Sequence, residues 1–372
     1  MIPFIDLKSQ YARIAERVEE ATVGVLRSGG YILGPVVEKL EARLAEFAGT
    51  QHCVSCASGT DALVMALMAK GIGPGDAVFT VPFTFVASAE AIATVGATPI
   101  FVDIEEDSFN MCPAALERAI AGLAELTPRG VVAVDLFGLP ADYTQINAIA
   151  ARHDLFVIED AAQSFGAVSN NKRAGALADI GCTSFFPAKP LGCYGDGGAI
   201  FCDDETLDGL LRSIRVHGQG SDKYENVRLG ITGRLDAIQA AVLDVKLDIF
   251  EDELVERQRV ADRYSARIAE AGLPLRTPTV PEGMRSAWAQ YTLVAQGKEH
   301  RAELQQRLAD AQIPTAIYYP KALHEQKAFA YLGYTRGDFP VSEAMGDAVF
   351  SLPMHPYLAD DQIDHIVDAM KG

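Results

Sequence analysis

The segment TSFFPAKPLG (residues 183–192), followed by GDGG (residues 195–198), carries the most specific signal in the sequence. It places Lys189 just after an apolar run, between two prolines and with no acidic residue before Asp196. Apolar surroundings disfavour the ammonium form of a lysine, so its amine becomes available to form a Schiff base. The nearby glycines allow unusual backbone angles and the close approach of a ligand.

Two simpler interpretations of this segment exist. A lysine in a surface turn is the ordinary one, and it would prevail if Lys189 stood alone. A loop that cradles a nucleotide is excluded, because the segment has neither the G-x-G-x-x-G spacing nor a Gly-Lys-Ser/Thr ending.

On either side of this segment, short apolar runs alternate with amphipathic stretches over the first two-thirds of the chain. Unbroken apolar runs such as 131–134 are typical of strands that are covered on both faces. Strands and helices in alternation predict right-handed crossovers and an α/β fold with a mostly parallel sheet between helices. The predicted strands are His52–Cys56, Ala77–Val81, Thr98–Ile104, Gly130–Phe137, Leu155–Glu159, Ile180–Phe186 and Ala199–Cys202. The predicted helices are Asp61–Lys70, Ser88–Val95, Pro113–Ala124 and Tyr143–His153.

After Arg234 the pattern changes to one long helical stretch, Asp236–Ala271, with an apolar stripe along one side. We expect a boundary near residue 250, between a large domain (1–250) and a small α+β domain (251–372). A helix of about Gln10–Leu26 is predicted as an N-terminal arm. In the small domain the predicted strands are Trp288–Ala295 and Thr315–Tyr319, and the predicted helices are His300–Ala311 and Asp360–Met370.

The segment FVIEDAAQ (residues 156–163) is a second candidate for chemistry. Its apolar strand ends in acids at the carboxyl edge of the predicted sheet, where open α/β folds bind ligands. A buried Asp160 needs a cationic partner, and the protonated ring nitrogen of pyridoxal 5′-phosphate (PLP) is such a partner. An aspartate that caps the following turn explains this segment equally well.

A third candidate is SGTD (residues 58–61), a turn that enters a helix directly after the strand His52–Cys56. The free N–H groups and the positive dipole end of such a helix suit a phosphate. Taken alone, the segment favours ordinary helix capping, because Ser and Thr are common N-cap residues.

Composition excludes several classes of function. A net charge of −18 argues against a nucleic-acid partner, because neutralising phosphates requires a basic face. No apolar stretch is long enough for a membrane span and the N-terminus lacks a secretory pattern, so we expect a cytoplasmic protein. Cys53 and Cys56 have the spacing of half a zinc site, but no second Cys or His pair matches it, so no metal site is expected.

Together these segments resemble the DegT/StrS family of nucleotide-sugar aminotransferases, whose members have the fold-type-I architecture of PLP enzymes. The similarity runs from PFIDL (residues 3–7) to YPKALH (residues 319–324), and the block from Ser184 to Gly198 is the most specific part. The resemblance implies a large PLP-binding domain with a mixed, mostly parallel sheet, a smaller C-terminal domain, and a homodimer with shared active sites.

The resemblance also implies roles for particular residues. Lys189 would form the Schiff base with PLP, Asp160 would pair with the pyridine nitrogen, and Gln163 would contact the ring hydroxyl. Phe85 would stack on the cofactor ring, whereas Phe83 is expected in the core. The residues implied in phosphate binding are Gly59, Thr60 and Ser184.

Substrate-side candidates are weaker. They lie in segments that line the sugar pocket in relatives, and they are His217, Arg234, Tyr319 and His324. His217 stands before Gly218, so helix C-terminal capping is its alternative role. Thr232 stands where the family usually has an asparagine that reaches the partner subunit's cofactor phosphate. A threonine is shorter and has one hydroxyl, which puts that contact in question.

The residue at position 189 favours a transaminase over the dehydratase branch of the family, which has histidine there. An amine can both form the Schiff base and shuttle a proton. We therefore expect transfer of an amino group from L-glutamate to a nucleotide-linked keto-sugar used in surface polysaccharides. The first choice of acceptor is the 3-oxo position of a UDP-2-acetamido-uronic acid, and a dTDP-3-keto-6-deoxyhexose or a 4-keto-sugar is the alternative. A PLP-dependent sugar dehydratase and a non-catalytic PLP-fold sensor are the alternatives from other classes.

Overall fold

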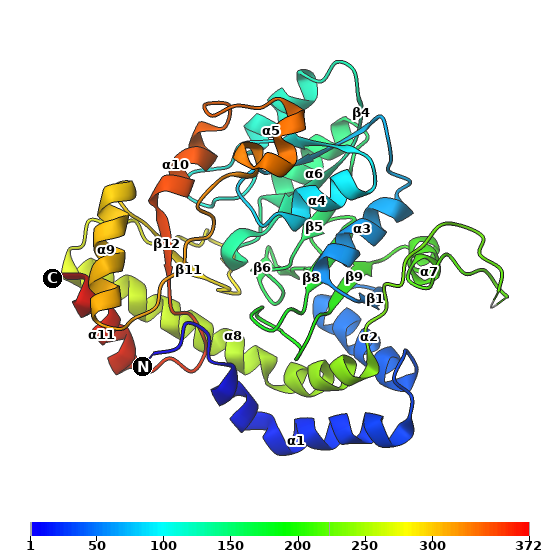
Figure 1. Cartoon of the computed structure of the whole chain (residues 1–372), viewed down its shortest axis with the longest axis horizontal. Coiled ribbons are helices and arrows are strands. Elements are labelled where there is room, and N and C mark those ends of the chain that lie inside the picture. Colours follow the sequence, from blue (N-terminus) through cyan, green and yellow to red (C-terminus); the bar gives the residue numbers. More distant parts are fainter. Residues whose placement is uncertain (1, 223, 372) are drawn as a thin grey trace.

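A seven-stranded sheet forms the centre of the protein, whose computed structural model describes residues 2–222 and 224–371 (Figure 1). The strand order is β1-β9-β8-β5-β4-β2-β3. Only β9 runs antiparallel to its neighbours, so the expected α/β fold with a mostly parallel, mixed sheet is confirmed. The strands are β1 (His52–Cys56), β2 (Asp76–Thr80), β3 (Thr98–Phe101), β4 (Thr127–Val134), β5 (Phe156–Asp160), β8 (Ile180–Ser184) and β9 (Gly198–Cys202).

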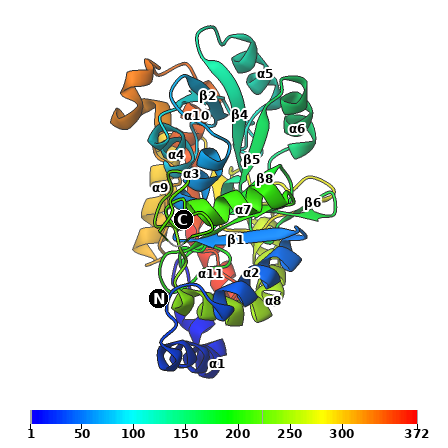
Figure 2. The same ribbon diagram turned by 90° about the vertical axis from the view of Figure 1, so that its right-hand side faces the viewer.

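Helices cover both faces of this sheet, as the unbroken apolar runs indicate. In β4, Val131 and Ala133 face one core cluster and Val132 faces the other. Figure 2 shows α3 and α4 on one side of the strands and α5 and α6 on the other. The helices of the first cluster are α2 (Pro35–Ala48), α5 (Pro113–Ala121), α6 (Tyr143–Arg152) and the first part of α8 (Ala237–Ala271). Those of the second are α3 (Gly59–Ala69), α4 (Ala87–Thr94) and α7 (Glu205–Ile214).

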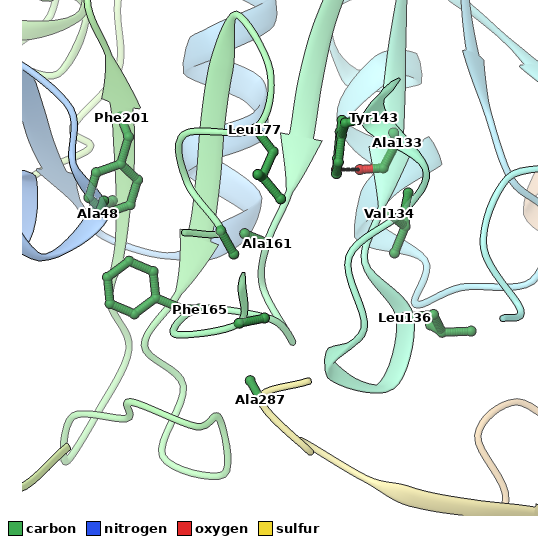
Figure 3. Packing of buried hydrophobic residues seen from close by; sticks show 14 of the residues in the cluster. Ala48, Ala133, Val134, Leu136, Tyr143, Ala161, Phe165, Leu177, Phe201 and Ala287 are labelled. Atoms are coloured by element: carbon green, nitrogen blue, oxygen red, sulfur yellow. Dashed lines mark hydrogen bonds between the residues drawn. The ribbon is translucent and has the colours of Figure 1, made fainter. Parts of the chain in front are cut away.

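Aromatic side chains make the core below the carboxyl edge of the sheet rigid. Phe165 stacks on Phe201 of β9, with ring centroids 5.4 Å apart (Figure 3). It also stacks on Phe250 of α8, with ring centroids 6.0 Å apart. The hydroxyl of Tyr143 donates to the carbonyl of Ala133 at 3.2 Å, which satisfies its polar end inside the cluster. The loops at this edge therefore rest on a closely packed layer.

The long helix α8 spans the boundary that we expect near residue 250, without a break. Its residues Leu243, Phe250 and Leu254 belong to the core beside the sheet, and Val260, Ala261, Tyr264 and Ile268 belong to a second core. The division into domains 1–250 and 251–372 stays a prediction, because residues 323–339 also pack against α4 and β3. The second core is built by α8 with α9 (Lys298–Asp310), β11 (Tyr291–Val294), β12 (Val349–Leu352) and α11 (Asp360–Lys371).

The N-terminal helix α1 (Leu7–Ser28) begins after Asp6, whose carboxylate accepts the amide N–H of Ser9 at 2.9 Å. It packs along α8 through Ile14 and Val18. Among the described residues, no helix combines the length and apolarity needed to cross a membrane.

Two predicted strands of the small unit were wrong in extent. Thr315–Tyr319 forms only an isolated bridge, between Ala316 and Ser351. Pro314 and Pro320 lack the N–H groups that a ladder needs, and Tyr319 turns away toward Phe83. Trp288–Ala295 shortens to β11, because Trp288 has a positive φ of 49° that no strand accommodates.

Candidate active site

Three chain segments that lie far apart in the sequence meet at the carboxyl edge of the sheet. β5 ends at Asp160 and its parallel neighbour β8 ends at Ser184. The first turn of α3 lies against the end of β8, since a Cβ added to Gly59 would be 2.6 Å from the Cβ of Ser184. The turn that carries Lys189 follows β8 directly. The structure thus brings the three candidate segments into one place.

Asp160 and Lys189 act on each other electrostatically. Burial raises the pKa of Asp160, while a hydrogen bond from Ser88 and the charge of Lys189 lower it. Burial lowers the pKa of Lys189, while the carboxylate of Asp160 opposes this change. Among the described residues no hydrogen-bond partner holds the Nζ of Lys189. An amine with a lowered pKa and no partner is suited to attack a carbonyl.

Ser88 is a site residue that sequence reasoning missed. Its Oγ donates to Oδ2 of Asp160 at 2.7 Å and lies 3.2 Å from the Oγ1 of Thr84. The amide N–H of Ala162 donates to Oδ1 of Asp160 at 3.3 Å. Both bonds favour the ionised carboxylate, which is the form that can hold a protonated ring nitrogen. In the sequence Ser88 was only the first residue of a predicted helix, so no signal distinguished it.

The cradle, defined as Gly59, Thr60 and Ser184, fits a phosphate. Ser58 is the N-cap of α3, and its Oγ accepts the N–H of Asp61 at 3.0 Å. Within the described part of the chain, the amides of Gly59 and Thr60 have no acceptor. Two free N–H groups at a helix N-terminus beside the hydroxyl of Ser184 suit a dianionic group. Ser58 therefore serves the helix, and its neighbours remain for a ligand.

An aromatic platform lies nearby. Phe85 is 52% exposed and its ring lies 6.4 Å from that of Tyr319, whereas Phe83 is fully buried as expected for the core. Gln163 is held at both ends: its Oε1 accepts the N–H of Phe137 at 2.8 Å and its Nε2 donates to the hydroxyl of Tyr319 at 3.3 Å. Burial raises the pKa of Tyr319, so its hydroxyl stays protonated at neutral pH.

Two substrate-side candidates lie on the segments around Thr232. The exposed ring of His217 lies 2.6 Å from the Thr232 Oγ1 through its Nε2. Its backbone has a positive φ of 63°, and the N–H of Gly218 donates to the carbonyl of Ser213 in the last turn of α7 at 2.8 Å, so the expected role at the end of this helix also fits. Arg234 is half-buried and, in the described chain, has neither an ion-pair nor a hydrogen-bond partner. The carbonyl of Gly233 accepts the N–H of Ala57 at 3.1 Å. Arg234 therefore follows a residue that is bonded to the segment just before Gly59 and Thr60 of the cradle.

His324 is held by internal contacts. It is buried, its Nε2 lies 3.0 Å from Oε1 of Glu343, and its ring lies 4.8 Å from that of Phe339. These contacts account for its burial without a substrate, and its substrate role stays a prediction. Among the described residues no group of three or more His, Cys, Asp or Glu side chains could hold a metal ion.

A hollow of about 830 Å³ lies at the opposite, amino edge of the sheet. Phe156 and Ile180, the first residues of β5 and β8, line it together with Lys70, Arg129 and Asp179. None of the predicted site residues borders it, so its size does not mark the site.

Comparison with known proteins agrees with this geometry. The chain is 47% identical over 372 residues to the UDP-2-acetamido-2-deoxy-3-oxo-D-glucuronate aminotransferase of Pseudomonas aeruginosa, an alignment that covers 100% of this chain and 99% of that protein. It is 42% identical over 368 residues to a pleiotropic regulatory protein of Geobacillus stearothermophilus, covering 99% and 97%. The crystal structure of a DegT DnrJ EryC1 StrS aminotransferase from Brucella abortus superimposes with a TM-score of 0.96 at 49% identity, covering 100% and 99%.

The cofactor follows from the same comparison. The structure of NtdA from Bacillus subtilis, solved with the bound cofactor PMP, matches with a TM-score of 0.90 at 28% identity, covering 99% of this chain and 82% of that one. PMP is the amine form of PLP, and the cradle, the Asp160 carboxylate and the free amine of Lys189 fit this group. The model of the DegT/DnrJ/EryC1/StrS aminotransferase family matches residues 12–371. The chain therefore belongs to this family and is a PLP-dependent aminotransferase.

Proposed function

We propose that this enzyme transfers the amino group of L-glutamate to the 3-oxo carbon of a UDP-linked 2-acetamido-uronic acid, in the cytoplasm, for the synthesis of a surface polysaccharide. The observation that carries the reaction is that the ends of β5 and β8 and the first turn of α3 meet at one edge of the sheet, which brings Asp160, the turn of Lys189 and the cradle together. The acceptor is proposed from the Pseudomonas aeruginosa relative, whose similarity covers the whole chain.

Bound PLP supplies an electron sink for the carbon that gains or loses the amino group. Ser88 and the amide N–H of Ala162 donate to Asp160 and so favour its ionised form, in which it would hold the protonated ring nitrogen. Lys189 would hold the cofactor, and its amine would move a proton to or from the reacting carbon. Burial lowers the pKa of this amine and so favours its neutral form.

The other predicted residues would fix the position of the cofactor. The cradle would hold its phosphate through the two free amides and the Ser184 hydroxyl. Phe85 would cover the ring, which gives its exposed side chain an apolar partner. Gln163 would contact the ring hydroxyl from an amide that Phe137 and Tyr319 already orient.

On the substrate side, Arg234 would bind an anionic group of the acceptor, either the diphosphate or the uronate carboxylate. A planar guanidinium without a protein partner suits such a bidentate contact. It would also supply local positive charge in a chain whose net charge is −18. We assign His217, Tyr319 and His324 to the sugar side as weaker members of this set.

We further propose a homodimer. Tyr31, Ile32 and Leu229 are large apolar residues that are exposed by 47, 51 and 88%. Ile32 bridges to Asp236, two residues after Arg234, so part of this apolar surface borders the site. A second copy of the chain across a twofold axis would cover it.

The direct test incubates the purified enzyme with L-glutamate and a panel of nucleotide keto-sugars, and measures 2-oxoglutarate. We expect turnover with the UDP-linked 3-oxo-uronic acid. Turnover with only a dTDP-3-keto-6-deoxyhexose or a 4-keto-sugar would contradict the proposed acceptor but leave the reaction in place.

A non-catalytic sensor is the second candidate, because one relative is named a regulatory protein. A sensor would release no 2-oxoglutarate as the wild-type protein, and its biological function would survive Lys189→Ala. An aminotransferase would release 2-oxoglutarate as the wild type, and Lys189→Ala would abolish both this release and the biological function.

A further inference from the structure

Lys246 of α8 is a buried lysine that the reaction, as described so far, does not use. Its side chain is 1% exposed, and its Nζ donates to the carbonyl of Gly192 at 2.6 Å. The same Nζ lies 4.1 Å from the ring centroid of Tyr194. Within the described chain no carboxylate forms an ion pair with it. A buried cation is costly unless it is well paired, so the loop 192–194 supplies the contacts that stabilise it.

Gly192 is packed against the turn that carries Lys189. A Cβ at position 192 would lie 2.5 Å from the carbonyl oxygen of Pro187 and 2.7 Å from that of Phe186. The carbonyl of Phe186 in turn accepts the amide N–H of Lys189 at 2.8 Å. The Gly192 carbonyl that Lys246 holds and the backbone of Lys189 therefore belong to one closely packed turn.

A second residue of α8 holds the same loop. Oε1 of Gln239 accepts the N–H of Tyr194 at 2.8 Å, and Gly195 packs on the Gln239 amide, where a Cβ would lie 3.0 Å from Nε2. Positions 239 and 246 are two helical turns apart and so lie on the same face of α8. Helix α8 thus contacts the loop through two side chains, those of Gln239 and Lys246.

We propose that Lys246 is a positioning residue for the aminotransferase: its ammonium group holds the Gly192 carbonyl and so fixes the turn that directs Lys189 toward Asp160. This inference rests on the proposed role of Lys189. Lys246 acts through position, because among the described residues its Nζ contacts the Gly192 carbonyl and the Tyr194 ring and forms no hydrogen bond with Lys189.

The test compares Lys246→Met, Lys246→Arg and Arg257→Met. Arg257 is the matched control, since it is a buried cation of the same helix whose NH1 donates to the carbonyl of Trp288, away from the loop. Thermal unfolding and near-UV circular dichroism first establish the folded fraction. Each variant is then incubated with PLP, reduced with borohydride, and digested to measure by mass spectrometry the fraction of Lys189 that carries the cofactor. Steady-state kinetics with glutamate follow.

For Lys246→Met we expect a loss of kcat of about 10- to 100-fold, as misplacement of a reacting group by about 1 Å causes, and slower fixation of PLP on Lys189. The KM for glutamate should stay within about twofold, since the contact serves the reacting lysine and not substrate binding. Lys246→Arg should recover most of both losses because it restores the donor. Arg257→Met should fix PLP at the wild-type rate once the folded fraction is taken into account.

A folded Lys246→Met enzyme with wild-type fixation and kcat would overturn the proposal, as would an equal loss of fixation in Arg257→Met. If Lys246→Met does not fold, Gln239→Leu decides, with slower fixation supporting the proposal and wild-type fixation overturning it. Turnover by Lys189→Ala would instead refute the proposed function itself, so the two failures are distinguishable.

Discussion

Polar groups at the two edges of the central sheet differ in whether they have partners within the protein. At the amino edge, several groups that line the large hollow serve the protein itself: Arg129 pairs with Asp76, Asp179 accepts the N–H of Val157, and the ammonium of Lys70 lies over the ring of Phe156. At the carboxyl edge, among the described residues, the amine of Lys189 and the amides of the cradle have no protein partner. The groups left free at the carboxyl edge belong to the three segments that meet there, whereas the large hollow borders none of the predicted site residues.

Substitution of a lysine at each edge would test this difference most severely. Lys189→Ala should lower turnover by about 10⁴-fold or more, because attachment of the cofactor and proton transfer are lost together. Lys70→Ala, which removes a cation from the rim of the hollow, should stay within about twofold of wild type. The measurement is the release of 2-oxoglutarate at saturating substrates. Equal losses of turnover in the two variants would contradict the assignment of the active site to the carboxyl edge.

A second way to sharpen the comparison uses glycines. Gly59→Ala places a Cβ against Ser184, so the cradle must open, and we expect the affinity for PLP to fall by about 10- to 100-fold. Gly209→Ala in α7 is its control, since nothing lies within 4 Å of a Cβ there and alanine stabilises a helix by about 0.5–1 kcal/mol. Fluorescence titration with PLP and thermal unfolding measure the two effects. Unchanged PLP affinity in Gly59→Ala would remove this residue from the cradle.

The smallest expected effect concerns Ser88. Its hydrogen bond lowers the pKa of Asp160, so Ser88→Ala should raise that pKa further above its usual range. In its proposed role Asp160 must be ionised to hold the ring nitrogen protonated, so we expect activity to be lost as the pH falls through its pKa. The acid limb of the pH profile of kcat should therefore move to higher pH, with the largest loss of activity on the acid side of the profile. An acid limb at the wild-type position would show that Ser88 does not tune Asp160.

The residues that could be predicted from the sequence differ from the others in how local their signal is. Lys189, Asp160 and the cradle stand at the ends of apolar strands, where a short window shows both the strand and the polar residue that follows it. Ser88 and Lys246 act on partners 72 and 54 positions away, and nothing in their own surroundings indicates those contacts. These contacts arise only when distant parts of the chain pack together, and the sequence pattern around each residue does not predict that packing.

The same limit applied to the fold. The sheet and its helices were predictable because each strand carries its own apolar run. The segment Thr315–Tyr319 has the composition of a strand but forms only one isolated bridge. Its flanking prolines lack N–H donors, and Tyr319 packs against Phe83, so no regular pairing with a neighbouring strand forms.

The central claim is that the cofactor is bound to the chain through Lys189, at the edge where polar groups are left free. The most direct measurement is borohydride reduction of the purified enzyme with PLP, followed by digestion and mass spectrometry. We expect the reduced pyridoxyl group on the peptide that contains Lys189, with loss of the visible absorbance band. The same group on Lys70, Lys246 or another lysine, with Lys189 unmodified, would contradict the account.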